Sequence, residues 1–354
     1  MKKLILLCAA VTALSGLPVS AADAPGVSAR AAIVLHADTG TVLYEKNADE
    51  ELLIASTTKI MTALVALERC DPDMEVTIRP EWTGIEGSSM YLKAGETYTL
   101  RELLYGMLLA SGNDAATAVA CTVAGSEDAF AALMNEKAAE LGLTGTSFEN
   151  PHGLDSPDHH STARDLAVLA AYAMENEEFA AIVSTRSKTI HDQTYVNHNK
   201  LLWQCEGTIG VKTGYTKAAG RALVSCCERE GTRYICVTLD DPCDWADHAA
   251  LYDWAFAEYT YVTAVEEDFT VELPAVCDGG GTVTVMPAEP VRALARPEDT
   301  VALRLELPRF VFPGVLAGDR AGRVTVTVNG VPAGETTLVY REDLPLPDRH
   351  RTAV

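Results

Sequence analysis

The sequence predicts an α+β catalytic domain, in which helices cluster on an antiparallel sheet, followed by a small all-β domain. Two observations carry this prediction. Extended apolar segments occur near both ends of residues 22–262, and helical periodicity fills the stretch between them. Beyond Thr263 the pattern changes to period-two alternation interrupted by Gly and Pro, which is typical of short strands. A chain of 354 residues is long enough for both domains.

The elements of the larger domain, residues 22–262, follow in chain order. Residues 31–44 predict a β-hairpin, because two apolar runs flank an Asp-Thr-Gly turn. Apolar residues at helical spacing then predict helices near 56–69, 100–110, 112–124, 126–141 and 162–175. The chain turns extended after Leu201, and the remaining elements are strands at 208–215, 221–227 and 233–239 and a closing helix at 247–259.

The smaller domain is predicted over residues 263–345. Its strands are expected at 269–273, 282–285, 301–305 and 324–328. This part of the sequence has no obvious catalytic cluster. Residues 346–354 are polar and interrupted by proline, and they predict a disordered tail.

The N-terminus predicts a signal peptide over residues 1–21. Lys2 and Lys3 precede a short apolar run, and Val19-Ser20-Ala21 supplies small residues at the spacing of a cleavage site. The run is shorter than the ~20 apolar residues of a membrane-spanning helix. The net charge of −22 argues against a nucleic-acid partner. We therefore expect an exported, extracytoplasmic protein.

The most informative motif is Ser56-Thr57-Thr58-Lys59. Positions i and i+3 share one face of a helix, so the Ser56 hydroxyl and the Lys59 amine can come within hydrogen-bonding range. A serine hydroxyl becomes a good nucleophile when a neighbouring base takes its proton. Taken alone, the motif equally fits a helix N-cap followed by a solvated lysine.

Two further motifs lie downstream. Ser111-Gly112-Asn113 follows an apolar helical run, and Lys212-Thr213-Gly214 lies within a short extended segment. Ser-x-x-Lys, Ser-x-Asn and Lys-Thr-Gly, in this order, form the motif set of penicillin-binding proteins and serine β-lactamases. Each triplet is weak by itself, but the ordered set on helix, loop and strand is specific.

Longer stretches resemble the D-alanyl-D-alanine carboxypeptidases, the low-molecular-mass penicillin-binding proteins of bacterial cell-wall metabolism. The similar segments are residues 31–44, 54–63, 150–155, 161–166 and 212–220. The resemblance covers about residues 25–260 and continues more loosely to about 345. It implies a penicillin-binding/serine β-lactamase-like fold for the larger domain.

The resemblance also implies an activity and a location. The expected enzyme is a serine-type D-Ala-D-Ala carboxypeptidase that removes the terminal D-alanine from peptidoglycan stem peptides through an acyl-enzyme on Ser56. β-Lactam antibiotics such as penicillin would bind covalently as inhibitors. The location would be the cell wall or the periplasmic space, and no metal or cofactor is needed.

The motif residues have expected roles. Lys59 is the expected base for Ser56, which requires a neutral amine; burial and the positive charge of Lys212 would lower its pKa. Lys212 is expected to stay charged and to orient Ser111 and the substrate carboxylate. Ser111 would relay the proton to the leaving D-alanine, and Asn113 would hold a substrate amide.

The third motif supplies the remaining substrate contacts. Backbone N–H groups of Ser56 and Tyr215 are the expected oxyanion donors. Gly214 is expected to let the substrate lie close to the strand edge, as in recognition by strand addition. Thr213 and Thr216 offer hydroxyls to the terminal carboxylate.

The chain departs from the family in two places. Many relatives end in an amphipathic helix that lies on the membrane, and no clear C-terminal membrane anchor is evident here. Some relatives carry Arg, thought to help hold the substrate carboxylate, where this chain has His198. His198 fits either a substrate contact or a polar loop residue.

Three other functions share parts of this pattern. A serine β-lactamase would share the acylation step, but the Glu-x-x-x-Asn segment of one large β-lactamase class is not evident. A non-catalytic wall-binding protein would keep the fold with a silent site. A zinc hydrolase would use the acidic and imidazole residues of the turn at 152–160, where no His-Glu-x-x-His pattern occurs.

The cysteines indicate no function. No Cys-x-x-Cys pair occurs, and the pairing of any disulfides cannot be read from the sequence. Cys226 and Cys227 lie in a predicted strand, and one or both are expected to behave as small buried hydrophobic residues.

Overall fold

The computed structural model describes residues 4–8, 23–276 and 280–346, which divide into two compact units. One unit spans Ala24–Ala255; the other takes the described residues up to Asp23 and from Phe256 onward. The predicted cleavage site after Ala21 lies outside the described residues, as does the tail beyond Leu346. We describe each unit by itself.

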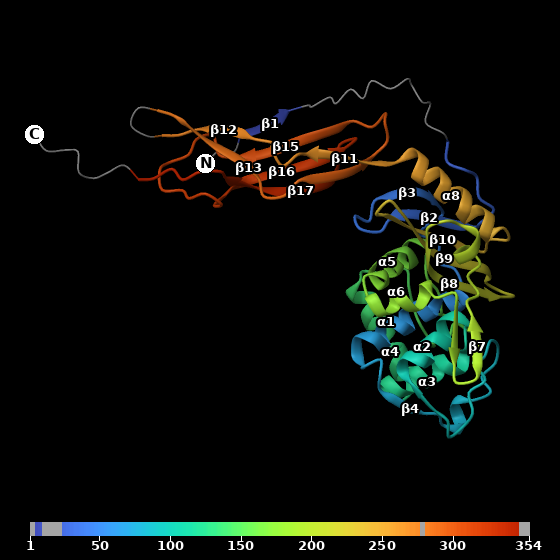
Figure 1. The fold of residues 1–354 in the computed structure, drawn as a ribbon. Helices are drawn as coiled ribbons and strands as arrows, with labels where there is room; N and C mark the ends of the chain where they lie inside the picture. The colour runs from blue at the N-terminus through green and yellow to red at the C-terminus, as the bar shows by residue number, and fades with distance from the viewer. Residues whose placement is uncertain (1–3, 9–22, 277–279, 347–354) are drawn as a thin grey trace, which may run out of the picture. The chain divides into compact units, whose positions relative to one another are not determined.

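The larger unit is built on one antiparallel sheet of five strands in the order β3-β2-β10-β9-β8 (Figure 1). The strands are β2 (Ala31–His36), β3 (Val42–Lys46), β8 (Thr208–Thr216), β9 (Gly220–Arg229) and β10 (Thr232–Leu239). The N-terminal hairpin therefore pairs, through β2, with β10, the strand of this sheet that comes last in the chain. β8, which carries Lys-Thr-Gly, is an edge strand. The predicted α+β fold class is confirmed.

Most helices of this unit follow the predicted runs closely. They are α1 (Lys59–Arg69), α2 (Leu100–Leu109), α3 (Asn113–Ala124), α4 (Glu127–Glu140), α5 (Ala163–Met174), α6 (Glu177–Ser184), α7 (Leu201–Gln204) and α8 (Asp244–Glu258). Side-chain caps explain several starts: Thr99 forms a capping box with Glu102, and Ser126, Thr162 and Asn176 cap α4, α5 and α6.

Some elements of the larger unit were not predicted. Ser56 lies in a 3₁₀ turn, η1 (Ala55–Thr58), so the α-helix starts only at Lys59. The others are η2 (Pro80–Trp82), the pair β4 (Glu75–Thr77) and β5 (Thr97–Thr99), the hairpin of β6 (Ser187–Ile190) and β7 (Gln193–Val196), and helices α6 and α7.

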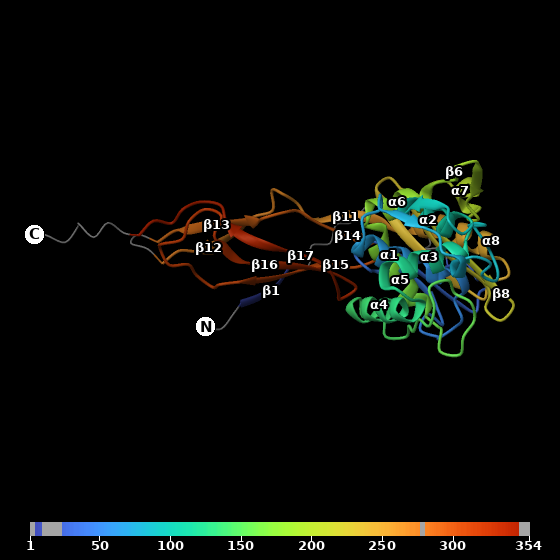
Figure 2. The ribbon, with the colours of Figure 1, turned by 90° about the horizontal axis from the view of Figure 1, so that it is seen from below.

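Helices cover both faces of the sheet. Helix α5 packs on β2, β9 and β10, and Figures 1 and 2 show it within a cluster that includes α1, α2 and α3. Helix α8 covers the opposite face. There His248 is fully buried, and its ring nitrogens lie 2.7 Å from the Ser225 hydroxyl of β9 and 2.9 Å from the Thr238 hydroxyl of β10. These hydrogen bonds satisfy the imidazole, whose burial without partners would destabilise the fold.

The smaller unit contains a six-stranded sheet in the order β1-β15-β16-β17-β13-β12 and the pair β11-β14. Its strands are β1 (Leu4–Cys8), β11 (Thr260–Val265), β12 (Val271–Pro274), β13 (Thr282–Pro287), β14 (Val291–Ala295), β15 (Val301–Leu307), β16 (Arg320–Val328) and β17 (Val331–Tyr340). Alternate residues such as Leu303, Leu305, Val324 and Val326 form its core. β1 belongs to the predicted signal peptide, so its pairing with β15 concerns the unprocessed chain.

Candidate active site

The three motifs meet at the edge of the sheet. Ser56 lies in η1, directly before α1, and the preceding Ala55 has a φ of +46°. Left-handed backbone at a residue other than glycine is strained, and such strain concentrates at functional sites. The Thr58 hydroxyl donates to Ala55 O (2.8 Å) and lies 2.7 Å from His159 Nε2. These contacts fix the turn that presents Ser56.

Lys59 is completely buried beside Ser56. Its Nζ lies 2.9 Å from Ser56 Oγ, 2.7 Å from Asn113 Oδ1 and 2.5 Å from the backbone oxygen of His152. The two carbonyl oxygens can only accept hydrogen bonds. A neutral amine therefore donates its two N–H bonds to Asn113 and His152, and its lone pair faces the Ser56 hydroxyl. This arrangement suits a base.

Burial lowers the pKa of Lys59 well below its ordinary 10.5, and the nearby positive charge of Lys212 lowers it further. Asp114 acts in the opposite direction, but its effect is the smallest of the three. The electrostatics of the site thus agree with the geometry, since both favour a neutral Lys59.

The second motif lies where α2 passes into α3. Ser111 has a φ of +61°, and Asn113 begins α3. The Asn113 amide nitrogen donates to the backbone oxygen of Glu86, which turns its oxygen toward Lys59. Next to it, buried Asp114 accepts hydrogen bonds from Ser89 Oγ and from the N–H groups of Met90 and Leu92.

The third motif brings a second buried lysine. Lys212 Nζ donates to Ser111 Oγ (3.2 Å) and to the backbone oxygen of Thr213 (2.9 Å). Burial lowers the pKa of Lys212 to about 7. Burial thus acts against the charged form, and the charged Lys212 that the sequence predicts stays a prediction, in which a bound substrate carboxylate would favour the cation.

Gly214 has a structural role that the sequence did not indicate. A Cβ at this position would lie 2.9 Å from Ile54 O, 3.1 Å from Ser56 N and 3.2 Å from Ala55 Cβ. Only glycine lets β8 approach the nucleophile turn this closely. The 3.1 Å distance places the Ser56 backbone nitrogen beside Gly214 of β8.

An open groove of about 600 Å³ runs over these residues. Ser56, Ser111, Thr213, Gly214 and Tyr215 line its reactive part. Its wall includes His198. It also includes residues that the sequence analysis did not single out: Lys200, Trp203, Arg221, Asp244 and Trp245. No motif marks these added residues in the sequence, because they come from separate elements that the fold brings together.

Thr216 is placed differently from the other predicted residues. Its hydroxyl donates to Asp155 Oδ1 (2.8 Å) and accepts from the N–H of Ala219 (2.9 Å). Thr216 is not among the residues that line the groove. Its single hydroxyl proton is therefore used inside the protein and is not directed toward a ligand.

Most of the acidic and imidazole residues at 152–160 also have internal partners. The Glu149 N–H donates to His159 Nδ1 (3.0 Å), so Nε2 carries the ring proton and donates to Thr58. Asp155 accepts from Thr216. Over the described ranges, no group of three or more His, Cys, Asp or Glu side chains is arranged to hold a metal ion.

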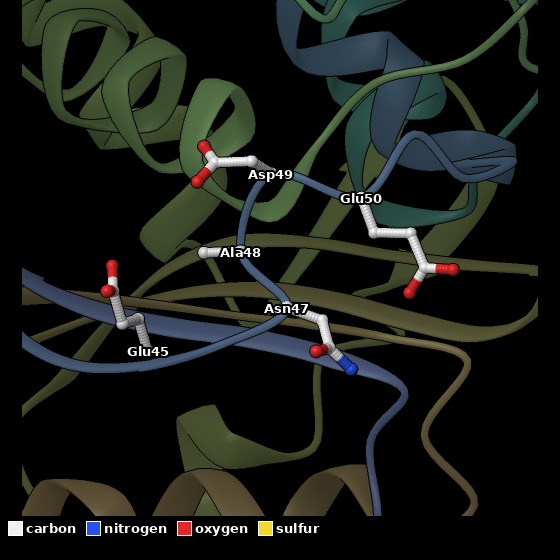
Figure 3. Close-up of a pocket in the computed structure, with 5 residues that line it drawn as sticks. All are labelled: Glu45, Asn47, Ala48, Asp49 and Glu50. Atoms are coloured by element: carbon white, nitrogen blue, oxygen red, sulfur yellow. The ribbon is translucent and has the colours of Figure 1, made fainter.

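A second hollow is lined by residues from the stretch 45–50, which includes the end of β3 and continues beyond it (Figure 3). Three of its lining residues are acidic: Glu45, Asp49 and Glu50. Arg164 pairs with Glu45 and Asp49, and Arg30 pairs with Glu50. These carboxylates are therefore satisfied by ion pairs within the chain.

A serine with a buried lysine against its hydroxyl, a second serine–lysine pair and an adjacent edge strand define an active-site serine acyl-transferase of the penicillin-binding class. The comparisons with known proteins give the family. The family model described as D-alanyl-D-alanine carboxypeptidase matches residues 18–243.

Curated relatives extend this match over most of the chain. The chain is 32% identical to D-alanyl-D-alanine carboxypeptidase DacF of Bacillus subtilis, over 89% of this chain and 86% of the relative. It is 34% identical to DacC of Escherichia coli, over 91% of this chain and 86% of the relative. Among solved structures, penicillin-binding protein 5 from Haemophilus influenzae superposes with a TM-score of 0.77 at 26% identity, covering 92% of this chain and 100% of that one.

The chain belongs to the D-alanyl-D-alanine carboxypeptidase family. It is a serine-type peptidase with the penicillin-binding fold, as the sequence predicted. Where the chain is described, no helix is both long and apolar enough to cross a membrane.

Proposed function

We propose that this carboxypeptidase cleaves the terminal D-alanine from stem peptides through an ester on Ser56, with Lys59 as the base. The main support for this proposal is the environment of Lys59 Nζ, which contacts two acceptor oxygens and one hydroxyl. As Ser56 Oγ attacks the carbonyl carbon between the two D-alanines, its proton passes to Lys59 Nζ.

The tetrahedral intermediate is proposed to rest against two backbone donors. The Ser56 N–H group lies beside β8, as the Gly214 contact supports, and the N–H of Tyr215 follows on that strand. The substrate backbone would lie along the edge of β8. Asn113 sits where its amide can hold a substrate amide while its oxygen holds Lys59.

The leaving group requires a proton and its carboxylate requires a cation. Ser111, hydrogen-bonded to Lys212, is proposed to give its proton to the leaving D-alanine amine and to regain one from Lys59, which took the proton of Ser56. Lys212 and Thr213 would bind the terminal carboxylate, whose negative charge raises the pKa of Lys212 and completes its protonation. A water molecule then hydrolyses the ester and frees Ser56.

Export and inhibition complete the proposal. Residues 1–21 would direct the chain out of the cytoplasm and be removed, which places the enzyme beside its peptidoglycan substrate. A β-lactam would acylate Ser56 as the peptide does and remain bound.

The activity is tested by mixing the mature protein with a peptide ending in D-Ala-D-Ala and measuring free D-alanine. The same peptide ending in L-Ala-L-Ala and the Ser56→Ala variant are the controls. Release of D-alanine from the first peptide alone, and only with Ser56 present, is expected. A folded protein that releases none and instead hydrolyses penicillin rapidly would indicate a β-lactamase.

A further inference from the structure

Two cysteine side chains outside the catalytic site lie against each other. Cys205 ends the short helix α7, and Cys227 lies near the end of β9. Their thiols share a hydrogen bond, and both sulfurs contact one oxygen, Glu206 O, at 3.9 Å for Cys205 and 3.3 Å for Cys227. Because both sulfurs contact the same oxygen atom, they lie close to each other.

The backbone holds both residues in this position. The Glu228 N–H donates to Gly207 O (2.8 Å), and the Thr208 N–H donates to Cys205 O (3.2 Å). A Cβ at Gly207 would lie 2.4 Å from Glu228 O and 3.2 Å from Cys227 Sγ. The turn that follows Cys205 is thus pressed against β9 beside Cys227.

The two thiols differ in reactivity. Arg229 Nη2 lies 3.7 Å from Cys205 Sγ. Hydrogen bonding from Cys227, with further help from Thr208 and Arg229, lowers the pKa of Cys205 below its ordinary value. The hydrogen bond to Cys205 and burial instead raise the pKa of Cys227. A thiolate is the attacking species in disulfide chemistry, so Cys205 is the nucleophilic member of the pair.

Access also favours Cys205. Cys205 is 8% exposed as a whole residue and lies between the exposed residues Gln204 and Glu206, whereas Cys227 is completely buried. An external reagent therefore reaches Cys205 first.

We propose that Cys205 and Cys227 form a disulfide by exchange with a low-molecular-mass disulfide. The Cys205 thiolate attacks one sulfur of the reagent, and the other sulfur leaves as a thiolate. Cys227, after losing its proton to solvent, attacks Cys205 Sγ and displaces the second thiolate. The two cysteines are oxidised, and the reagent is reduced to two thiols.

The link would fasten one wall of the catalytic groove. Trp203 lies in α7 and lines the groove together with His198 and Lys200, which precede that helix. Cys227 lies in β9, which pairs along the length of β8. The disulfide would tie the end of this wall to the sheet that carries the Lys-Thr-Gly motif. The proposal concerns the thiols and does not depend on the catalytic assignments.

The experiment oxidises the folded mature protein with glutathione disulfide at pH 7, blocks remaining thiols by alkylation and maps linked peptides by mass spectrometry without reduction. We expect a peptide pair joined through Cys205 and Cys227. We also expect the oxidised protein to melt several degrees higher than the reduced protein, because a closed loop restricts the unfolded chain.

Variants distinguish the two sulfurs. Cys227→Ser should stop the exchange at its first stage and retain glutathione on Cys205, whereas Cys205→Ser should leave Cys227 reduced. Cys226→Ser, adjacent to Cys227 and equally buried, should still form the link. Alkylation of both Cys205 and Cys227 in the oxidised, folded wild-type protein, or a link between other cysteines, would overturn the proposal, even if a variant fails to fold.

Discussion

At the scale of single residues, the account depends on how Lys59 uses its three contacts. The carbonyl oxygens of Asn113 and His152 each take an N–H, and this leaves the lone pair for Ser56. The sequence predicted the Ser56–Lys59 pair from spacing. It gave no sign of the His152 carbonyl, because a backbone acceptor from a loop 93 residues away carries no residue-type signal.

Lys59→Arg should reduce the rate of Ser56 acylation by roughly 10²–10⁴-fold, the usual contribution of a general base. A guanidinium stays protonated at all practical pH values and so cannot accept the serine proton. The rate is measured with a chromogenic cephalosporin. Lys93→Arg is the matched control, because Lys93 is 80% exposed and far from the motifs in sequence. Near-normal acylation in Lys59→Arg would exclude Lys59 as the base.

Lys212 predicts a particular pH dependence. Since its pKa is about 7, acylation of the free enzyme should fall as pH rises through 7, when the cation that binds the carboxylate is lost. Lys212→Arg keeps its charge and should remove that decrease, although its different geometry should lower the overall rate. The measurement is the second-order acylation rate between pH 5 and 10. An unchanged decrease in Lys212→Arg would assign it to another group.

At the scale of elements, the site exists because a 3₁₀ turn, a helix start and an edge strand converge. The sequence predicted the main helices and the sheet strands, where apolar periodicity is strong. It missed the hairpin β6–β7, whose residues are mostly exposed and therefore show little alternation. It also missed the 3₁₀ turn at Ser56, since helical spacing does not distinguish a tight first turn from an α-helix.

Gly214→Ala tests the contact between these elements. The added methyl group would meet Ile54 O and Ser56 N, so we expect a loss of about 1–3 kcal/mol in the free energy of unfolding and slower acylation. Gly26→Ala is a suitable control, because a Cβ there meets nothing within 4 Å. Denaturant unfolding and acylation rates check both effects. A Gly214→Ala protein as stable and as active as the control would show that the close approach is unimportant.

At the scale of the whole molecule, pairing of the first hairpin with the last strand of the larger unit determines where the motifs meet. The sequence predicted this architecture because strands at both ends enclose a helical middle. It could not give the wall of the groove, since Trp203, Arg221 and Trp245 come together only through the tertiary fold.

Buried histidines should make the folded protein sensitive to acid. Burial lowers the pKa of His248 and His152 to about 3 and that of His159 to about 4, against an ordinary value of 6.5. Below pH 6.5 the unfolded chain binds more protons than the folded one, so stability falls with decreasing pH until the folded pKa is reached. For His248 alone the loss by pH 5 is about 2 kcal/mol.

Denaturant unfolding between pH 7.5 and 4.5 measures this effect. Burial raises the pKa of Asp241, so the folded chain binds this proton more readily than the unfolded chain. This group therefore favours folding at lower pH, and it reduces the slope of the free energy of unfolding against pH. His248→Gln should flatten the pH dependence of the free energy of unfolding. The control variant His191→Gln, at an exposed position, should leave that dependence unchanged. Stability that stays constant or rises toward pH 4.5 in the wild-type protein would contradict the buried, neutral state of these imidazoles.

The central claim is that Ser56 is the nucleophile, and the most direct measurement is the site of covalent attachment of penicillin. The folded mature protein is incubated with benzylpenicillin, digested and examined by tandem mass spectrometry. We predict a single penicilloyl group on Ser56 that is absent from Ser56→Ala. An adduct on Ser111 or another residue, or no adduct on a folded protein that releases D-alanine, would contradict the account.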